Sequence, residues 1–254
     1  MKRKIDVICP IHYVDLESFE IFLNTWIQNI PIRKLVIGIG KENQDLMDLI
    51  YKYMKKVSIQ IVEQYWHKTL GYCLQELINL VETEYFIFLH ADVEILLNWF
   101  DRMWESRVRG ILESLKTPSF GPEALIQAQK HRAYSGAQLI LKESVKNLNF
   151  VDDFVYCNED LIIQNIVLNR GFSYIKTPIY HNHYRLLRKR SQDRETILDW
   201  QWRGIIKYAY PTYRLMNYVK GLVKTMNSQY HHHIEIEKEI EKINPKWLSL
   251  LIEK

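Results

Sequence analysis

Short runs of β-branched and aromatic residues alternate along the chain with segments in which apolar residues recur at helical spacing. The runs predict strands, because each is ended by proline, glycine or polar residues. They cover residues 5–9, 35–39, 57–62, 85–89, 137–141 and 173–179. The segments between them predict helices over most of the gaps, as in an α/β domain with a mostly parallel sheet.

Three of the helices are marked by an apolar face, over residues 16–30, 70–81 and 159–169. Core packing accounts for each of these faces. Gly171 follows the third helix, where a glycine predicts a left-handed cap. Residues 107–135 are less regular and predict no defined element.

The composition is that of a globular protein, since 47% of the 254 residues are hydrophobic and 25% are charged. Disorder and fibrous structure are thereby excluded. The length accommodates one large domain with an extension. We place the domain at residues 1–183 and a basic, aromatic-rich helical extension at residues 184–254.

The net charge of +4 is too small to indicate a protein that binds nucleic acid. Residues 184–233, however, hold 10 basic and 3 acidic residues. Within them one helical face is apolar, and Lys220 and Lys224 lie off it. The face consists of Met216, Val219, Leu222, Val223 and Met226. Such a helix lies on an anionic membrane surface, caps the sheet, or makes a homodimer contact.

The cysteines show no disulfide or metal spacing, which favours a reducing cytoplasm. They are Cys9, Cys73 and Cys157. The apolar stretch after the basic N-terminus is too short for a signal peptide. The longest apolar stretch, residues 85–100, contains His90, Asp92 and Glu94 and predicts no membrane span. We expect a cytoplasmic protein, or one peripheral on the inner face of the membrane.

Polar residues beyond the carboxyl ends of the strands are the candidates for chemistry, because ligands bind there in such sheets. Asp92 and Glu94 follow the strand at 85–89, and in an extended segment both carboxylates would point to one side and hold a divalent cation. His181 and His183 repeat that spacing and offer imidazole ligands. A solvated turn is the alternative for the acidic pair.

Glu159 and Asp160 open the third helix. The helix dipole alone favours carboxylates there. In the functional alternative, one of the two is a general base that takes a proton from an attacking hydroxyl near a metal-bound phosphate. The spacing does not choose between these alternatives.

Several motifs follow one another between residues 4 and 185. They are Pro10–Tyr13, Gly71, Glu84–Leu89 with His90–Asp92, Ser135–Leu141, Phe150–Asp153, Glu159–Asp160 with Asn169–Phe172, and Pro178 with His181. Their order and spacing resemble the family 2 glycosyltransferases of the GT-A fold. The resemblance implies a Rossmann-like domain with a C-terminal helical appendage.

The resemblance also implies an activity: an inverting transfer of a sugar from a nucleotide-diphosphate donor of the UDP, GDP or dTDP type to a glycan or lipid-linked acceptor. It implies Mn²⁺ or Mg²⁺ as the cofactor. Asp92 matches the last position of the family's D-x-D metal motif. Asp160 matches the catalytic base, with Glu159 beside it.

Further site residues follow from the same resemblance. His181 or His183 matches an additional metal ligand. Pro10 and His12 match positions that contact the nucleotide, and Lys68 matches a basic residue that reaches the base or the diphosphate.

Two positions depart from the family pattern. Gly40 and the residues after it replace an Asp-Asp pair, and His90 replaces the first Asp of D-x-D. The metal shell is therefore Asp92 with Glu94, or Asp92 with a histidine. The alternative function is a catalytically silent GT-A domain that binds a nucleotide or acts as a membrane-associated scaffold. A nucleotidyltransferase is disfavoured by the lack of a glycine-rich loop near the first strand.

Overall fold

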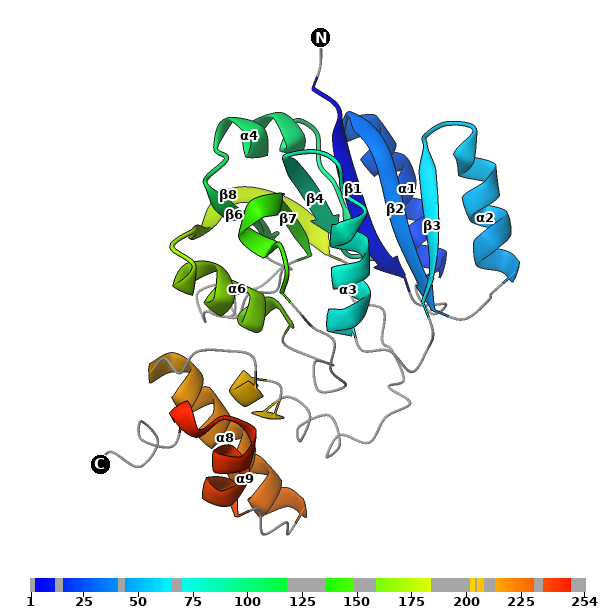
Figure 1. The fold of residues 1–254 in the computed structure, drawn as a ribbon. Coiled ribbons are helices and arrows are strands. Elements are labelled where there is room, and N and C mark those ends of the chain that lie inside the picture. The colour runs from blue at the N-terminus through cyan, green and yellow to red at the C-terminus, as the bar shows by residue number, and fades with distance from the viewer. Residues whose placement is uncertain are drawn as a thin grey trace.

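The computed structural model shows an α/β domain followed by C-terminal helices (Figure 1). It describes residues 3–11, 16–40, 44–64, 70–117, 136–148, 159–183, 202–203, 205–207, 213–230 and 235–247.

Eight strands form the sheet. They are β1 (Ile5–Ile11), β2 (Ile32–Gly40), β3 (Ile59–Gln64), β4 (Tyr85–Leu89), β5 (Val93–Glu94), β6 (Gly110–Lys116), β7 (Ala137–Leu141) and β8 (Ser173–His183). The helices are α1 (Leu16–Asn29), α2 (Gln44–Met54), α3 (Leu70–Asn79), α4 (Trp99–Glu105), α6 (Glu159–Asn169), α8 (Tyr213–Tyr230) and α9 (Ile236–Ile243), with short 3-10 turns η2 (Lys142–Val145) and η3 (Pro245–Trp247).

The strand order is β3-β2-β1-β4-β7-β6-β8-β5. Strands β3, β2, β1 and β4 are parallel, β7 is antiparallel to both β4 and β6, β8 is parallel to β6, and β5 is antiparallel to β8. The expected α/β class is confirmed. The sheet is mixed, because β7 enters it in the opposite direction between β4 and β6.

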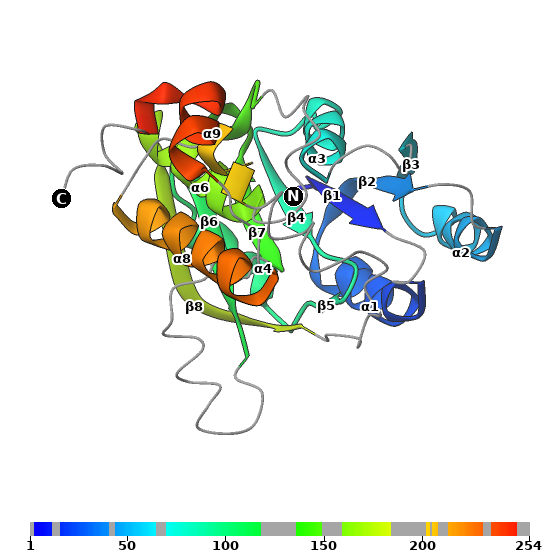
Figure 2. The ribbon, with the colours of Figure 1, turned by 90° about the horizontal axis from the view of Figure 1, so that it is seen from below.

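The two faces of the sheet bury separate apolar clusters. One cluster joins β1 to α1, α2 and α4 and includes Trp26 and Trp99. The other joins the opposite face to α3, α6 and the C-terminal helices and includes Phe86 and Trp202. Figure 2 shows α1 and α3 on opposite sides of the sheet. Side chains that alternate along the strands thus contribute to both apolar clusters.

Several predicted elements are confirmed. Strands at residues 85–89 and 137–141 have the expected bounds. Gly171 has φ 78°, its N–H donates to Leu168 O and the N–H of Phe172 donates to Val167 O. This pattern is a Schellman cap, and it ends α6 where the sequence predicted.

The strand β6 lies where no element was expected. Glu113 and Ser114 interrupt its apolar run, yet they are only 2% and 0% exposed. Both side chains have hydrogen-bond partners in neighbouring strands, so this polar pair belongs to the interior. The last predicted strand is also longer than expected, because β8 continues through His183.

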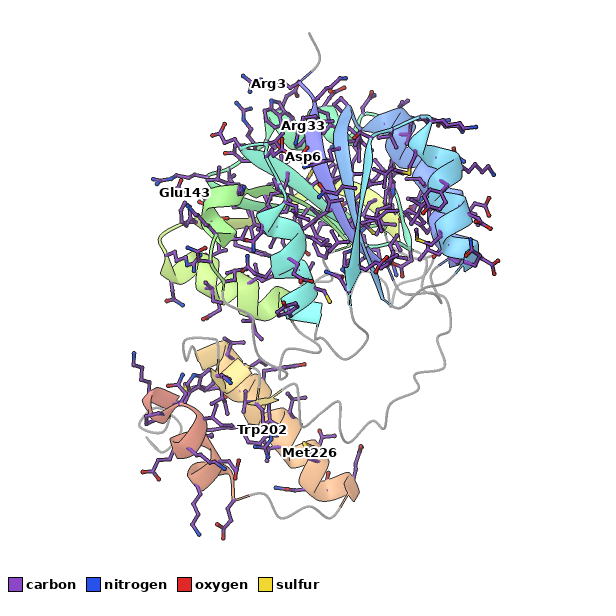
Figure 3. All side chains as sticks on the ribbon, turned by 45° about the vertical axis from the view of Figure 1, so that its right-hand side comes forward. Arg3, Asp6, Arg33, Glu143, Trp202 and Met226 are labelled. Atoms are coloured by element: carbon purple, nitrogen blue, oxygen red, sulfur yellow. The ribbon has the colours of Figure 1, made fainter. Side chains whose placement is uncertain are left out.

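The C-terminal helices lie beyond the edge toward which β1 and its parallel neighbours run (Figure 1). The predicted apolar face of α8 is buried at Val219, Leu222, Val223 and Met226. Figure 3 shows Met226 close to Trp202, which belongs to the same apolar cluster. An ion pair of 2.6 Å between Arg203 and Glu239 links this part to α9.

Burial of this face favours the helical cap among the alternatives for the extension. Among the described residues, no helix combines the length and the apolar character that crossing a bilayer would require.

Candidate functional site

Strands β1 and β4 bring two of the predicted donor-site residues to one edge of the sheet. The strands are parallel and Ile8 pairs with Phe88, so Pro10 lies level with His90 two residues further on. Asp92 lies two residues after His90. Pro10 itself pairs with Gly38 of β2. The carboxyl edge of the sheet, where ligands bind in such folds, therefore carries Pro10 and Asp92.

Asp92 lies in a turn between β4 and β5. The N–H of Val93 donates to His90 O at 3.2 Å, and the N–H of His90 donates to Gly136 O at 2.9 Å. Asp92 is only 5% exposed. The segment from Asp92 to Glu94 is thus extended only from Val93 onward, unlike the fully extended segment that the sequence suggested.

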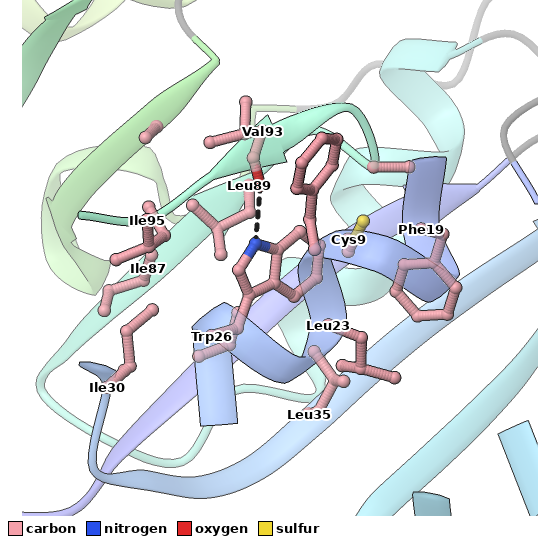
Figure 4. Packing of buried hydrophobic residues seen from close by; sticks show 14 of the residues in the cluster. Cys9, Phe19, Leu23, Trp26, Ile30, Leu35, Ile87, Leu89, Val93 and Ile95 are labelled. Carbon is pink, nitrogen blue, oxygen red and sulfur yellow. Dashed lines mark hydrogen bonds between the residues drawn. The ribbon is translucent and has the colours of Figure 1, made fainter. Parts of the chain in front are cut away.

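Helix α1 fixes the segment that follows Asp92. The indole Nε1 of Trp26 donates to Val93 O at 2.7 Å (Figure 4). Asn29 Nδ2 donates to Ile95 O at 2.9 Å. Trp26 is fully buried, so these bonds hold β5 against the core and set the position of the turn before it.

Strand β8 brings the predicted histidines beside this turn. Val93 pairs with His183, and Glu94 pairs with Asn182. The Nδ2 of Asn182 donates to Glu94 Oε2 at 2.7 Å. Because directly opposed residues share a face and alternate residues change face, Glu94 lies on the face opposite to His181.

His181 is fully buried and lies against β6. Its Nδ1 is 2.7 Å from Ser114 Oγ. That hydroxyl also donates to Ala137 O at 3.1 Å. This hydrogen bond fixes the orientation of the buried ring.

A buried polar cluster lies nearby in the sheet and was missed by the sequence reasoning. Tyr174 Oη donates to the carboxylate of Glu113, and Gln138 Nε2 donates to Tyr174 Oη. Burial raises the pKa of Glu113, while Lys176, Tyr174 and Gln138 oppose that rise. The available signal was a glutamate within an apolar run of strand length.

The predicted catalytic pair lies at the start of α6, whose helical residues begin at Glu159. Ile162, Ile163 and Val167 bury one side of this helix against the sheet. The side chains of Glu159 and Asp160 lie outside the described part of the structure, as does the side chain of His183. His12 and Lys68 lie wholly outside the described residues. Their roles stay predictions.

The candidates to hold a divalent cation are the carboxylate of Asp92 and the imidazoles of His181 and His183. The side chains that the structure describes contain no group of three His, Cys, Asp or Glu residues placed to bind a metal. The backbone nevertheless sets His183 opposite Val93, one residue from Asp92. A carboxylate oxygen suits Mn²⁺ and Mg²⁺, so Asp92 fits the cofactor that the resemblance implies, while the imidazole of His183 lies outside the described side chains.

Comparisons of the amino-acid sequence with known families and proteins find no relative of this chain. No protein-family model matches the chain. No curated protein matches it in sequence.

Solved structures do match it. A mannosyltransferase from Pyrobaculum calidifontis, in complex with GDP-Man and Mn²⁺, is 10% identical with a TM-score of 0.61 and covers 100% of this chain and 77% of its own. Residues 1–349 of S. aureus TarS, in complex with UDP-GlcNAc, are 12% identical with a TM-score of 0.62 and cover 98% and 84%. GalNAc-T7 with UDP, GalNAc and Mn²⁺ is 13% identical with a TM-score of 0.57 and covers 94% and 54%. The chain therefore has the GT-A fold of these nucleotide-sugar transferases.

Proposed function

We propose that this protein is an inverting, family 2-like glycosyltransferase that moves a sugar from a nucleotide-diphosphate donor to a hydroxyl of a glycan or lipid-linked acceptor, with Mn²⁺ or Mg²⁺. One observation carries the proposal. The carboxyl edge of the sheet holds Asp92 in a turn beside the β5–β8 ladder, which sets His183 opposite Val93. Transferases of the same fold bind GDP-Man or UDP-GlcNAc, and several hold Mn²⁺.

The donor would lie along this edge. Pro10 and His12 would contact the nucleotide, and Lys68 would reach the base or the diphosphate. Asp92, with a histidine of β8, would hold the metal ion. Glu94 fits this shell less well, because it lies on the face of the ladder opposite to His181 and accepts a hydrogen bond from Asn182.

In this proposal the chain's own residues transfer a proton and orient the donor and the acceptor. Asp160, with Glu159 beside it at the start of α6, would take the proton of the acceptor hydroxyl as that oxygen attacks the anomeric carbon. Attack opposite to the leaving diphosphate inverts the configuration at that carbon. A bound divalent ion supplies neutralisation of the charge that develops on the diphosphate, so a second carboxylic acid is not required.

A catalytically silent domain is the second candidate, and one observation favours it. His90 stands at the first position of the metal motif, and its ring packs edge-on against Phe88 at 5.1 Å. That contact supplies a structural role for a residue that is acidic in the family pattern. A silent domain would bind a nucleotide without turning a donor over.

A thermal-shift screen tests the proposal. UDP, GDP, dTDP and CDP are each added with and without Mn²⁺ to the wild type, to Asp92→Asn and to a control, Asp101→Asn. Asp101 is exposed on α4, away from the carboxyl edge. A ligand at about 100 times its Kd adds about 2.7 kcal/mol, which raises Tm by roughly 5–10 °C.

We expect one nucleotide to raise Tm in a Mn²⁺-dependent manner, with the shift lost in Asp92→Asn and kept in Asp101→Asn. Sugar transfer from the matching donor should then fail in Asp160→Asn while nucleotide binding persists. A nucleotide shift without any turnover of donor would favour the silent domain. The absence of a shift with all four nucleotides would remove the donor site.

A further inference from the structure

We infer that the amino edge of the sheet is a binding surface for an anionic polysaccharide. The amino edge is the end at which β1, β4, β6 and β8 begin and the antiparallel strand β7 finishes. It is opposite to the carboxyl edge, which carries Pro10 and Asp92. The inference goes beyond the sugar transfer proposed above and does not depend on it.

Basic side chains gather at this edge, although the domain as a whole is slightly acidic. Eight basic and four acidic residues occupy the segments that border it, which are residues 3–4, 84, 101–109, 142–146 and 170. Residues 1–183 together hold 20 basic and 22 acidic residues. Figure 3 shows Arg3 and Glu143 at the opposite end of the molecule from Trp202. A local excess of positive charge of this kind attracts polyanions.

Aromatic rings hold three exposed arginines of this edge in place. Arg3 and Arg107 lie over Trp104, with Cζ 5.3 Å and 4.8 Å from the centroid of its ring. Arg109 lies over Phe172 at 5.2 Å. Stacking on a ring fixes the plane of a guanidinium without neutralising its charge. The N–H groups at the edge of each guanidinium can therefore donate to an anion.

Backbone carbonyls hold a fourth exposed arginine, Arg170. It donates to the carbonyl oxygens of Ser144, Lys146 and Asn147 at 3.2 Å, 2.7 Å and 3.1 Å. In the part of the chain that the structure describes, none of the four arginines forms an ion pair with a carboxylate. Their charges are oriented but not neutralised, so an anion binds them without the full entropic cost of ordering the side chains.

The helix dipole accounts for only part of this array. Arg107 and Arg170 come just after α4 and α6, where a positive charge is favoured at the end of a helix. Arg3 and Arg109 instead come just before β1 and β6, where no helix ends. Stabilisation of helix ends therefore does not explain why four arginines share one edge.

A cavity beside Arg3 indicates which kind of polyanion fits this edge. It measures about 360 Å³, lies between the end of α1 and α4, and has Arg3, Gln28, Phe100 and Trp104 among its walls. Phe100 and Trp104 are stacked with their ring centroids 5.9 Å apart. Aromatic rings beside a few polar groups suit a sugar ring, whose hydroxyls both donate and accept hydrogen bonds. A polysaccharide with acidic groups therefore matches both the cavity and the arginines.

Fluorescence anisotropy of end-labelled polygalacturonate, titrated with the full chain, tests the inference. Nucleotide and metal are omitted, so the result is independent of the donor site. Methyl-esterified polygalacturonate is the matched ligand, because it has the same sugar chain without the charge. We expect the acidic polymer to bind, its affinity to fall as the salt concentration rises, and the ester to bind at least about tenfold more weakly.

Two double variants with the same change in net charge locate the binding surface. Arg107→Glu/Arg109→Glu reverses charge within the array, and Lys220→Glu/Lys224→Glu reverses it on α8, where both lysines are exposed. We expect the first to weaken binding at least about tenfold and the second by less than about twofold. Arg107→Gln/Arg109→Gln removes the charge without adding acidic groups and should give an intermediate loss, and circular dichroism checks that each variant is folded.

Several results would overturn the inference. Equal losses in the two charge-reversed variants would mean that net charge alone explains binding. Equal affinity for the ester would exclude a role for the arginines, and the absence of binding would exclude the surface. Tighter binding of double-stranded DNA, polyglutamate or anionic vesicles than of polygalacturonate would assign the amino edge to a different class of partner.

Discussion

Asp6 and Arg33 form a two-pronged ion pair across the start of the parallel sheet (Figure 3). Arg33 donates through Nε to Oδ1 and through a terminal nitrogen to Oδ2, both at 2.7 Å. Asp6 is fully buried, whereas the side chain of Arg33 is 34% exposed. Asp6 Oδ2 also accepts from the N–H of Glu82 at 2.7 Å. One carboxylate therefore ties β1 to β2 and to the loop before β4.

Asp6→Asn should lower the free energy of unfolding by about 2 kcal/mol, because it removes the charged acceptor of the buried hydrogen bonds from Arg33 and from the N–H of Glu82. Urea denaturation monitored by circular dichroism measures this loss. The matched control is Glu82→Gln, which removes another partner of Arg33. Glu82 is 62% exposed, so we expect a much smaller change there. Equal losses in the two variants would contradict the central role of Asp6.

Gly38 and Gln64 offer a second test of packing at the carboxyl edge. A Cβ at Gly38 would clash with Oε1 and Cδ of Gln64. Gln64 is 4% exposed, and its Nε2 donates to Cys73 O at 2.9 Å. The glycine thus leaves room for the side chain that joins the end of β3 to α3.

Gly38→Ala should lower the free energy of unfolding by about 1–3 kcal/mol, since it forces Gln64 out of its place. In the double variant Gly38→Ala/Gln64→Ala the clash is absent. The combined loss should therefore be clearly smaller than the sum of the single losses in a double-mutant cycle. Additive losses would show that the two residues are not coupled.

The sequence predicted those elements whose local pattern and tertiary environment agree. The strand at 137–141 is apolar except for Gln138 and buried on both faces, so its bounds were evident. Strand β6 was not, because Glu113 and Ser114 look like loop residues and are satisfied only by partners on β7 and β8. Residues 234–242 alternate Ile and Glu, which resembles a strand. Helix α9 forms there because isoleucines also recur at spacings of three and four.

The candidate site was likewise predictable from the sequence only in part. That Asp92 lies at the edge of the sheet follows from the strand before it. The face on which Glu94 lies does not, because it depends on the turn at His90–Val93 and on pairing with Asn182. These contacts are long-range, so spacing within the motif carried no information about them.

The buried carboxyl of Glu113 makes a prediction about pH. Burial raises its pKa above the ordinary value of 4.5, so the folded protein binds this proton more tightly than the unfolded chain. The corresponding stability is present in full below pH 4.5 and is lost as pH rises through the folded-state pKa. Glu113→Gln keeps an acceptor for Tyr174 and has no such loss.

We therefore expect the stability of Glu113→Gln relative to the wild type to increase with pH above 4.5 and then to level off. Urea midpoints between pH 2 and pH 8 measure it and the control together. Glu82→Gln supplies an opposite control, since Lys34 and Arg33 lower the pKa of Glu82 to about 2. That variant should lose stability relative to the wild type as pH rises from 2 through 4.5. A flat difference for Glu113→Gln would contradict the assigned ionisation.

The two faces of α8 distinguish a helical cap from a membrane-binding helix. Lys220 and Lys224 are exposed, while Val223 is 2% exposed within the apolar cluster that includes Trp202 and Trp247. In a cap, the apolar face is already occupied by the protein. Val223→Asp should then lower stability by several kcal/mol, because it buries an unpaired charge. Lys220→Glu/Lys224→Glu should change stability by about 0.5 kcal/mol or less.

Co-sedimentation with vesicles that contain anionic lipid completes this comparison, at a salt concentration near 0.15 M so that weak surface attraction is screened. We expect the wild type and Lys220→Glu/Lys224→Glu to remain in the supernatant to the same extent, because an interfacial helix needs a free apolar face to insert. Strong binding of the wild type that charge reversal abolishes, together with unchanged stability in Val223→Asp, would instead make α8 the membrane contact. The basic face and the apolar face therefore give separate readouts of the role of the extension.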